Sequence, residues 1–319
     1  MSDSPNATLG IVFPGQGSQS IGMLKELAAT HAVVQETFAA ASQVLGYDLW
    51  HLVLNGSEEE LNQTAQTQPA MLAAGVAVWR VWRAQGGGEP VVMAGHSLGE
   101  YTALVCADAL GFEDAVALVA ERGRLMQDAV PAGVGAMAAI LGLDDDQVRA
   151  VCVKAAQGEI VEAVNFNSPG QVVVAGHAAA VQRAMAAAKQ AGAKRALALA
   201  VSAPSHCALM LPAAERLAER LATVTINAPR IPVLHNADVA AYKEGVAIRD
   251  ALVRQLHQPV RWVETIQAMR ARGVSTVLEC GPGKVLAGLI KRINSTLVVQ
   301  PVYDTATLQQ ALDIGSKFG

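Results

Sequence analysis

The apolar residues of this chain occur in two patterns that alternate along the sequence, short continuous runs and helical spacing. Continuous apolar runs at 9–13, 91–95 and 275–280 predict short buried strands. Between these runs, apolar residues recur at helical spacing across 22–45 and 68–84. Strands that alternate with helices indicate an α/β protein, with an open, largely parallel sheet covered by helices on both faces.

The same alternation continues in the last third of the chain. Helical patterns cover 207–221, 246–256 and 260–272, and apolar runs at 231–236 and 297–302 predict further strands. We expect these elements to extend the parallel sheet that begins near the N-terminus. No internal repeat and no low-complexity linker interrupts the pattern.

The segment from 130 to 203 has a different order of elements. Ser168-Pro169-Gly170 predicts a tight turn between two of its strands, and Asp144 is a suitable helix N-cap. The order β-α-β-β-α-β is that of a split, ferredoxin-like unit. We therefore expect a small subdomain at 130–203, inserted into a large domain made of 1–129 and 204–319. The predicted elements of the small unit are strands 136–143, 161–167, 171–176 and 194–201 and helices 144–157 and 177–192.

Composition narrows the class of protein. Hydrophobic residues make up 52% of the 319 residues and charged residues only 16%, which favours a large buried core over disorder. The net charge of −4 comes without a run of Lys or Arg, so nucleic acid is not an expected partner. No uncharged apolar stretch reaches the ~18 residues that cross a membrane, so no membrane partner is expected either.

Cysteine spacing and the N-terminal residues bear on the compartment. The four cysteines are widely spaced and form no C-x-x-C pair, which argues against a disulfide framework or a zinc site. The first ten residues lack the basic start and apolar core of a signal peptide. We expect a soluble, cytoplasmic protein that uses no metal and no redox cofactor.

The strongest chemical signal is GHSLG at 95–99, which fits the pattern G-x-S-x-G. A predicted strand precedes it and a helical pattern follows, the context in which this pattern exposes a serine on a sharp turn. Ser97 is then a nucleophile, and the N–H of Leu98 is the natural first donor to an oxyanion. The alternative is a chance match in a chain with many glycines.

A serine nucleophile needs a base, and the chain has seven histidines. His206 lies in a loop that returns from the small unit to the large one, although lone loop histidines are commonly only solvated. His96 adjoins Ser97, but we expect the tight turn to direct its ring away; His235 ends a strand as a core or rim residue. No acidic residue before His206 stands out as the third member of a hydrolase triad. A backbone carbonyl or a Gln side chain is therefore an alternative orienter of the imidazole.

Two further segments admit a functional and a structural interpretation. The loop FPGQGSQ at 13–19 lacks the third glycine of a dinucleotide fingerprint and the G-K-S/T of a phosphate loop. Its Gln16 N–H could donate to an oxyanion; otherwise the loop is an ordinary strand-to-helix turn. Arg122, in the helical run 112–127, is either a solvated surface charge or a guanidinium that binds a substrate carboxylate in a bidentate manner.

A series of motifs, in order and nearly end to end, resembles the malonyl-coenzyme A:acyl carrier protein transacylase family of fatty acid synthesis. The motifs are FPGQGSQ, QTQPA, GHSLGEY, ERGRLMQ, NSPGQVVVAG, VSAPSHCALM, QPVRW and GPGKVL. The resemblance implies an α/β-hydrolase-like parallel-sheet domain with an inserted ferredoxin-like subdomain, in agreement with the elements predicted above. It also implies an acyltransferase that moves a malonyl group from malonyl-CoA to the phosphopantetheine thiol of holo acyl carrier protein, without a cofactor.

The same resemblance implies roles for individual residues. Ser97 would carry the malonyl group as an ester, and His206 would act as its general base and later as the acid toward the leaving thiol. Backbone N–H groups of Gln16 and Leu98 would form the oxyanion hole. The remaining positions are Arg122, which would hold the malonyl carboxylate, Gln255, which would orient His206 through its backbone carbonyl, and Asn165, which is expected near the site.

Other functions would use some of the same residues. A serine esterase or thioesterase would share the serine turn but would not need Arg122. A docking subunit that only binds acyl carrier protein would need neither Ser97 nor His206. A free-standing acyltransferase of a polyketide pathway would keep the chemistry, although SAPSH at 202–206 matches the fatty-acid type of this loop better than the methylmalonyl-selecting type.

Overall fold

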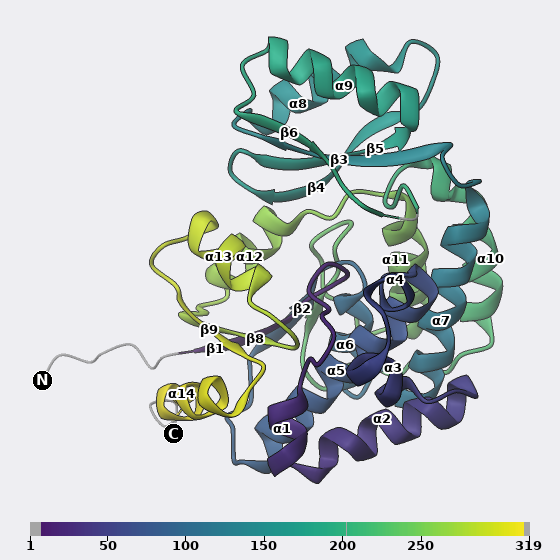
Figure 1. Cartoon of the computed structure of the whole chain (residues 1–319). Coiled ribbons are helices and arrows are strands. Elements are labelled where there is room, and N and C mark those ends of the chain that lie inside the picture. The colour runs from purple at the N-terminus through teal and green to yellow at the C-terminus, as the bar shows by residue number, and fades with distance from the viewer. Residues whose placement is uncertain (1–7, 202, 316–319) are drawn as a thin grey trace, which may run out of the picture.

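The computed structural model describes residues 8–201 and 203–315, and within them the strands form two separate sheets (Figure 1). The larger sheet has five parallel strands in the order β7-β2-β1-β8-β9, which confirms the predicted parallel sheet. Residues 1–7, 202 and 316–319, included in the expected domains, lie outside the described part of the chain. The five strands are β1 (Leu9–Phe13), β2 (Val92–Gly95), β7 (Val233–Leu234), β8 (Thr276–Cys280) and β9 (Val298–Val302).

The larger sheet is buried on both faces, and β1 at its centre shows why. All residues of β1 are buried, as expected for a strand covered from both sides. Ile11 and Phe13 pack in the cluster that contains residues of α5 and α6, whereas Val12 packs in the cluster under α12 and α13. Helices therefore cover both faces (Figure 1). Their bounds are α5 (Thr64–Ala84), α6 (Gly99–Cys106), α12 (Trp262–Ala271) and α13 (Val285–Ile293).

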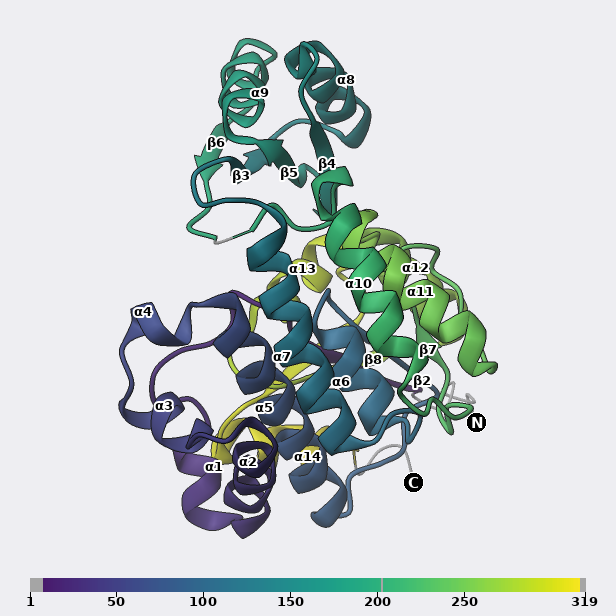
Figure 2. The same ribbon diagram turned by 90° about the vertical axis from the view of Figure 1, so that its right-hand side faces the viewer.

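The other helices surround this core. Figure 2 shows α7 (Phe112–Ala129) beside α10 (Leu211–Ala222), and α7 also packs against α5. Within the described ranges, no helix combines the length and the apolarity that a membrane crossing requires. The remaining helices are α1 (Lys25–Thr30), α2 (Ala32–Leu45), α3 (Leu49–Asn55), α4 (Glu58–Leu61), α11 (Gly245–His257), α14 (Thr305–Gly315) and the short 3-10 turn η1 (Ala208–Met210).

Helix boundaries differ from the prediction for local reasons. The pattern across 22–45 divides at His31, whose extended backbone (φ −133°) separates α1 from α2. α3 and α4 were not predicted, because they are too short to display a helical period. Each is started by a side-chain cap, from Asp48 and Ser57 respectively.

Two predicted strands are shorter than expected. The run at 231–236 contributes only the two residues of β7, because beyond them the N–H of His235 turns to the carbonyl of Ala240. The run at 194–201 pairs with its neighbour only over β6 (Arg195–Ala198). Both segments then leave their sheets and lead toward the region that holds the candidate site.

The smaller sheet comes from one continuous stretch of chain and is antiparallel, in the order β4-β5-β3-β6. The predicted β-α-β-β-α-β order is confirmed, and a capping box from Asp144 starts α8. Val174 of β5 packs under α8 and α9, whereas Val173, on the opposite pleat, belongs to the hydrophobic cluster that contains Cys207. This second face is turned toward the larger sheet (Figures 1 and 2), so residues of both sheets can share one site. The elements are β3 (Gly135–Leu141), α8 (Asp145–Ala156), β4 (Val161–Ser168), β5 (Gln171–His177), α9 (Ala178–Gln190) and β6.

Candidate active site

The turn after β2 brings Ser97 out of the larger sheet. Ser97 has a left-handed backbone (φ 50°), and Leu98 is the N-cap of α6. A Cβ on Gly95 would lie 1.8 Å from the carbonyl carbon of Gly99, and a Cβ on Gly99 would lie 2.1 Å from the carbonyl oxygen of Phe13. Only glycine can occupy these two positions. The two glycines of the pattern thus let the strand, the serine turn and the helix lie in direct contact.

His206 reaches Ser97 from the loop that follows the smaller sheet. Its Nε2 lies 2.8 Å from Oγ of Ser97, and its Nδ1 lies 2.7 Å from the backbone carbonyl oxygen of Gln255. A carbonyl can only accept, so Nδ1 carries the ring proton and Nε2 is left to accept from the serine hydroxyl. The N–H of His206 also donates to the carbonyl of Leu256 at 3.1 Å, which attaches this loop to α11.

Burial keeps the imidazole of His206 neutral. Only 2% of the residue is exposed, and the loss of hydration, reinforced by the positive charge of Arg122, lowers its pKa from 6.5 to about 3. The hydrogen bond to Gln255 raises the pKa but does not outweigh burial. At neutral pH His206 is therefore an unprotonated acceptor, the state that a general base requires.

Arg122 lies inside the site and not on the surface, with 1% of the residue exposed. Its Nη1 donates to Oε1 of Gln68 at 2.8 Å, and its Nη2 donates to Oε1 of Gln255 at 3.0 Å. Nη2 also lies 3.4 Å from Oγ of Ser97. Burial lowers the pKa of Arg122, and none of the described residues forms an ion pair with it. A buried guanidinium held only by neutral partners is well suited to receive an anionic group from a ligand.

A cavity of about 120 Å³ lies over these groups, between the two sheets. Gln16 and Leu98 line it from the larger sheet, and Met137 and Asn165 line it from the smaller one. Among the described residues, neither the Gln16 N–H nor the Leu98 N–H donates to another protein group. Two residues that line the cavity beside Ser97 thus each carry a backbone N–H without a protein acceptor in the described part of the chain, the kind of donor that an oxyanion hole uses.

Asn165 and His96 border the same cavity with different surroundings. Oδ1 of Asn165 is buried and has no protein partner within the described residues. Nε2 of His96 lies 2.8 Å from Oδ1 of Asn167, and its ring meets the Trp262 ring edge-on at 5.4 Å. Burial lowers the pKa of His96. The ring is held by Asn167 and makes no hydrogen bond to Ser97 in the described part of the chain.

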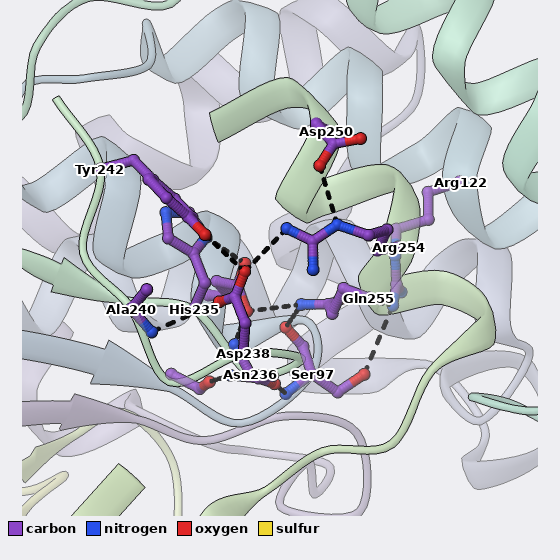
Figure 3. Close-up of polar contacts among 12 residues, drawn as sticks. Ser97, Arg122, His235, Asn236, Asp238, Ala240, Tyr242, Asp250, Arg254 and Gln255 are labelled. Carbon is purple, nitrogen blue, oxygen red and sulfur yellow. Dashed lines mark hydrogen bonds and ion pairs between the residues drawn. The ribbon is translucent and has the colours of Figure 1, made fainter. Parts of the chain in front are cut away.

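Three buried polar side chains of the site were not predicted, namely Gln68, Glu100 and Asn236. Figure 3 shows Asn236 and Gln255 close to Ser97. Sequence offers one weak signal for them, because Gln68 and Glu100 each interrupt a helix that is otherwise largely apolar. His235, which the sequence left as a core or rim residue, is fully buried and pairs with Glu100.

Groups that would hold a metal are not found near the cavity or elsewhere in the described ranges. No three His, Cys, Asp or Glu side chains of those residues cluster as a metal site requires. The four cysteines are buried and free.

Comparison with known proteins gives a consistent result across the whole chain. The sequence model of the acyl transferase domain matches residues 11–308. The malonyl CoA-acyl carrier protein transacylase of Escherichia coli strain K12 is 59% identical over 303 residues, which cover 95% of this chain and 98% of that protein. The corresponding transacylase of Haemophilus influenzae is 60% identical over 298 residues, covering 93% of this chain and 96% of that protein.

Solved structures agree with these relatives. The crystal structure of an acyl carrier protein S-malonyltransferase from Vibrio cholerae has a TM-score of 0.93 at 60% identity, covering 95% of this chain and 99% of that chain. A malonyl-transacylase in complex with its type II PKS acyl-carrier protein has a TM-score of 0.96 at 58% identity, covering 97% of this chain and 100% of that chain. The chain therefore belongs to the acyl transferase domain family and, within it, to the malonyl CoA-acyl carrier protein transacylases.

Proposed function

We propose that this chain transfers the malonyl group of malonyl-CoA to the phosphopantetheine thiol of holo acyl carrier protein through a malonyl ester of Ser97. One observation carries the proposal: Oγ of Ser97 lies 2.8 Å from a neutral imidazole, His206, and 3.4 Å from a buried guanidinium, Arg122. The first pair suits acyl transfer, and the guanidinium suits an acyl group that ends in a carboxylate. The shared family with malonyl CoA-acyl carrier protein transacylases supports the same reaction.

In the first half-reaction, Oγ of Ser97 attacks the thioester carbonyl while Nε2 of His206 takes the hydroxyl proton. The N–H groups of Gln16 and Leu98 stabilise the negative charge that develops on the carbonyl oxygen. The carbon–sulfur bond then breaks, and His206 gives its proton to the departing sulfur of CoA. The second half-reaction reverses these steps with the thiol of the carrier as the nucleophile. All steps use side chains and backbone groups of this chain.

Gln255 and Arg122 act at opposite ends of the acyl group, Gln255 through the orientation of His206 and Arg122 through the carboxylate. The carbonyl of Gln255 fixes the imidazole tautomer, so that Nε2 faces the serine. Arg122 holds the malonyl carboxylate, and its contacts with Gln68 and Gln255 fix the plane of the fork. Asn165, whose Oδ1 has no protein partner among the described residues, is positioned to contact the substrate.

The ester must survive in water until the carrier arrives. His206 is oriented by a neutral backbone carbonyl and not by a carboxylate, and the malonyl carboxylate is held by Arg122. We propose that this arrangement disfavours a well-placed hydrolytic water. Malonyl-enzyme that decays in buffer as fast as it is discharged to a carrier would contradict this explanation.

The pathway that receives the product depends on the carrier. Most of the similar proteins named above are simply malonyl CoA-acyl carrier protein transacylases, and one is bound to a type II PKS acyl-carrier protein. We propose fatty acid synthesis as the main role. Comparing discharge rates with a fatty-acid carrier and a type II PKS carrier tests this choice, since faster discharge to the latter would favour the polyketide pathway.

We further propose a division into a small subdomain at 130–203 and a large domain formed by 1–129 and 204–319. The two sheets and their separate hydrophobic clusters support this division. We also propose a cytoplasmic location, because the four free cysteines suit a reducing compartment.

Intact-protein mass spectrometry tests the proposed function directly. Wild type and Ser97→Ala are incubated briefly with malonyl-CoA, and holo acyl carrier protein is then added. A malonyl adduct on wild type alone, discharged to the carrier, is the expected result. Free malonate without an adduct would indicate a hydrolase, and no adduct with no turnover would indicate a binding subunit.

A further inference from the structure

A buried carboxylate that the proposed reaction does not use lies beneath the serine turn. Glu100, in the first turn of α6, has no exposed surface. Its Oε2 accepts from the N–H of Asn236 at 2.8 Å and from Nε2 of Gln255 at 3.0 Å. Its Oε1 lies 2.7 Å from Nδ1 of His235. One side chain thus connects α6, the loop after β7 and the end of α11.

The partners of Glu100 hold the backbone of Ser97 on both sides. Oδ1 of Asn236 accepts from the Ser97 N–H at 2.7 Å, while its Nδ2 donates to the carbonyl of Gly95 at 2.7 Å. Nε2 of Gln255 donates to the Ser97 carbonyl at 2.8 Å. Figure 3 shows Asn236 and Gln255 beside the labelled Ser97. A left-handed residue other than glycine persists only where its surroundings hold it, and here two amide side chains do so.

The direction of the Gln255 amide decides what the site presents. Its nitrogen faces two acceptors, the Ser97 carbonyl and Oε2 of Glu100, while its oxygen accepts from Nη2 of Arg122. The two ends of an amide have nearly the same shape, so only their partners select the direction. A carboxylate can accept but not donate, and it therefore keeps the nitrogen of Gln255 toward the serine and the oxygen toward Arg122.

We propose that Glu100 is a positioning residue for acyl transfer, which acts through Gln255 and Asn236 to fix the Ser97 turn and the acceptor that holds Arg122. The inference rests on the proposed function. Glu100 does not line the cavity over Ser97. The proposed role requires the carboxylate oxygens of Glu100 to be within hydrogen-bond distance of Asn236 and Gln255. A shorter side chain loses these hydrogen bonds even when it keeps the charge.

Two conservative variants separate reach from charge. Glu100→Asp keeps the charge and shortens the side chain. Glu100→Gln keeps the length, and its amide oxygen can still accept from Asn236 and Gln255. Its amide nitrogen then donates to Nδ1 of His235, so the ring proton of His235 must move to Nε2, which has no partner among the described residues. The positioning role therefore predicts faster acylation in the Gln variant than in the Asp variant. A role of the charge alone predicts the reverse order.

Glu279 provides a matched control. Like Glu100, Glu279 is a fully buried glutamate, but it lies in β8 of the larger sheet. Its oxygens accept from the N–H groups of Leu286 and Ala287 at 3.0 and 2.7 Å. It does not line the cavity. Glu279→Asp and Glu279→Gln should lower the unfolding midpoint and leave the acylation rate constant unchanged. They show what the loss of a purely structural carboxylate does.

The measurement is rapid-quench acylation of Ser97 by malonyl-CoA, read by intact mass as rate constant and burst amplitude. Glu100→Asp should slow the rate constant by about tenfold to a hundredfold, the loss expected from a small misplacement of reacting groups. The burst amplitude per total protein should stay full, whereas a merely structural role would lower this amplitude and leave the rate constant unchanged. In a Gln255→Ala background, the additional loss from Glu100→Asp should be smaller, because the part of the effect that passes through Gln255 is already lost and only the part through Asn236 remains.

Two results would overturn the inference: a wild-type rate constant in folded Glu100→Asp, or an equal loss in the Gln255→Ala background. If Glu100→Asp does not fold, Glu100→Gln provides the test. Its rate constant should lie between those of wild type and Gln255→Ala. A Glu100→Gln variant slower than Gln255→Ala would contradict action through Gln255. A wild-type protein that forms no malonyl adduct would instead refute the proposed function, so the two failures are distinguishable.

Discussion

Replacing Arg122 by alanine tests the selectivity of the site. The guanidinium can offer the malonyl carboxylate two charge-assisted hydrogen bonds in a place with 1% exposure. Breaking such a buried pair costs about 3–5 kcal/mol, and each ~1.4 kcal/mol is a factor of ten. We therefore expect kcat/KM for malonyl-CoA to fall by about a hundredfold to several thousandfold. Acetyl-CoA lacks the carboxylate, so its kcat/KM should remain or rise.

The assay compares kcat/KM for malonyl-CoA and acetyl-CoA with holo acyl carrier protein as acceptor. Arg122→Lys should give an intermediate loss, because an ammonium keeps the charge but cannot form the same fork. Arg124→Ala is the control, since Arg124 lies on the same helix but is exposed and pairs with Glu121 and Asp128. An unchanged malonyl-to-acetyl ratio in folded Arg122→Ala would refute the assigned role. It would also favour a serine esterase over a malonyltransferase.

Three further predictions follow from the same site and sheet. The pKa of about 3 for His206 keeps it unprotonated, so kcat/KM for malonyl-CoA should be flat from about pH 5 to 8; an inflection near the ordinary histidine pKa would show that the base titrates there. Burial raises the pKa of Glu279 from 4.5 to about 7, so the folded protein binds a proton that the unfolded chain releases. This contribution to stability is complete below pH 4.5 and is lost as pH rises through 7. The free energy of unfolding, measured by chemical denaturation from pH 4.5 to 8, should therefore fall less steeply in Glu279→Gln than in wild type. Parallel pH dependences in the two proteins would contradict this prediction. Gly95→Ala should yield little folded protein, because its Cβ would lie 1.8 Å from the carbonyl carbon of Gly99; normal circular dichroism and unfolding would show that the turn can open.

The elements that carry the site could be predicted from local patterns. The strand, turn and helix around Ser97 were visible because apolar runs, two glycines and helical spacing are all local features. The β-α-β-β-α-β order of the smaller sheet was visible for the same reason. Short elements such as α3 and α4 were not, since four to seven residues contain too little of a helical period.

Contacts between distant segments could not be predicted from pattern alone. The sequence marks His206 only as one histidine among seven, and its meeting with Ser97 and Gln255 results from how the chain returns from the smaller sheet. Family resemblance supplied those positions. Glu100 was overlooked, because a charged residue near a helix start is ordinarily solvated, and only the packing of α11 and the loop after β7 buries it.

The central position of β1 affects how the protein is made. β1 is synthesised long before β8, one of its two neighbours, which begins at Thr276. A nascent chain that stops short of β8 has an apolar strand with one open edge, a species prone to aggregate. β1 therefore gains its second neighbour only after β8 has been synthesised. Formation of the core should be slow and sensitive to truncation before β8, even though the serine turn is synthesised well before that strand.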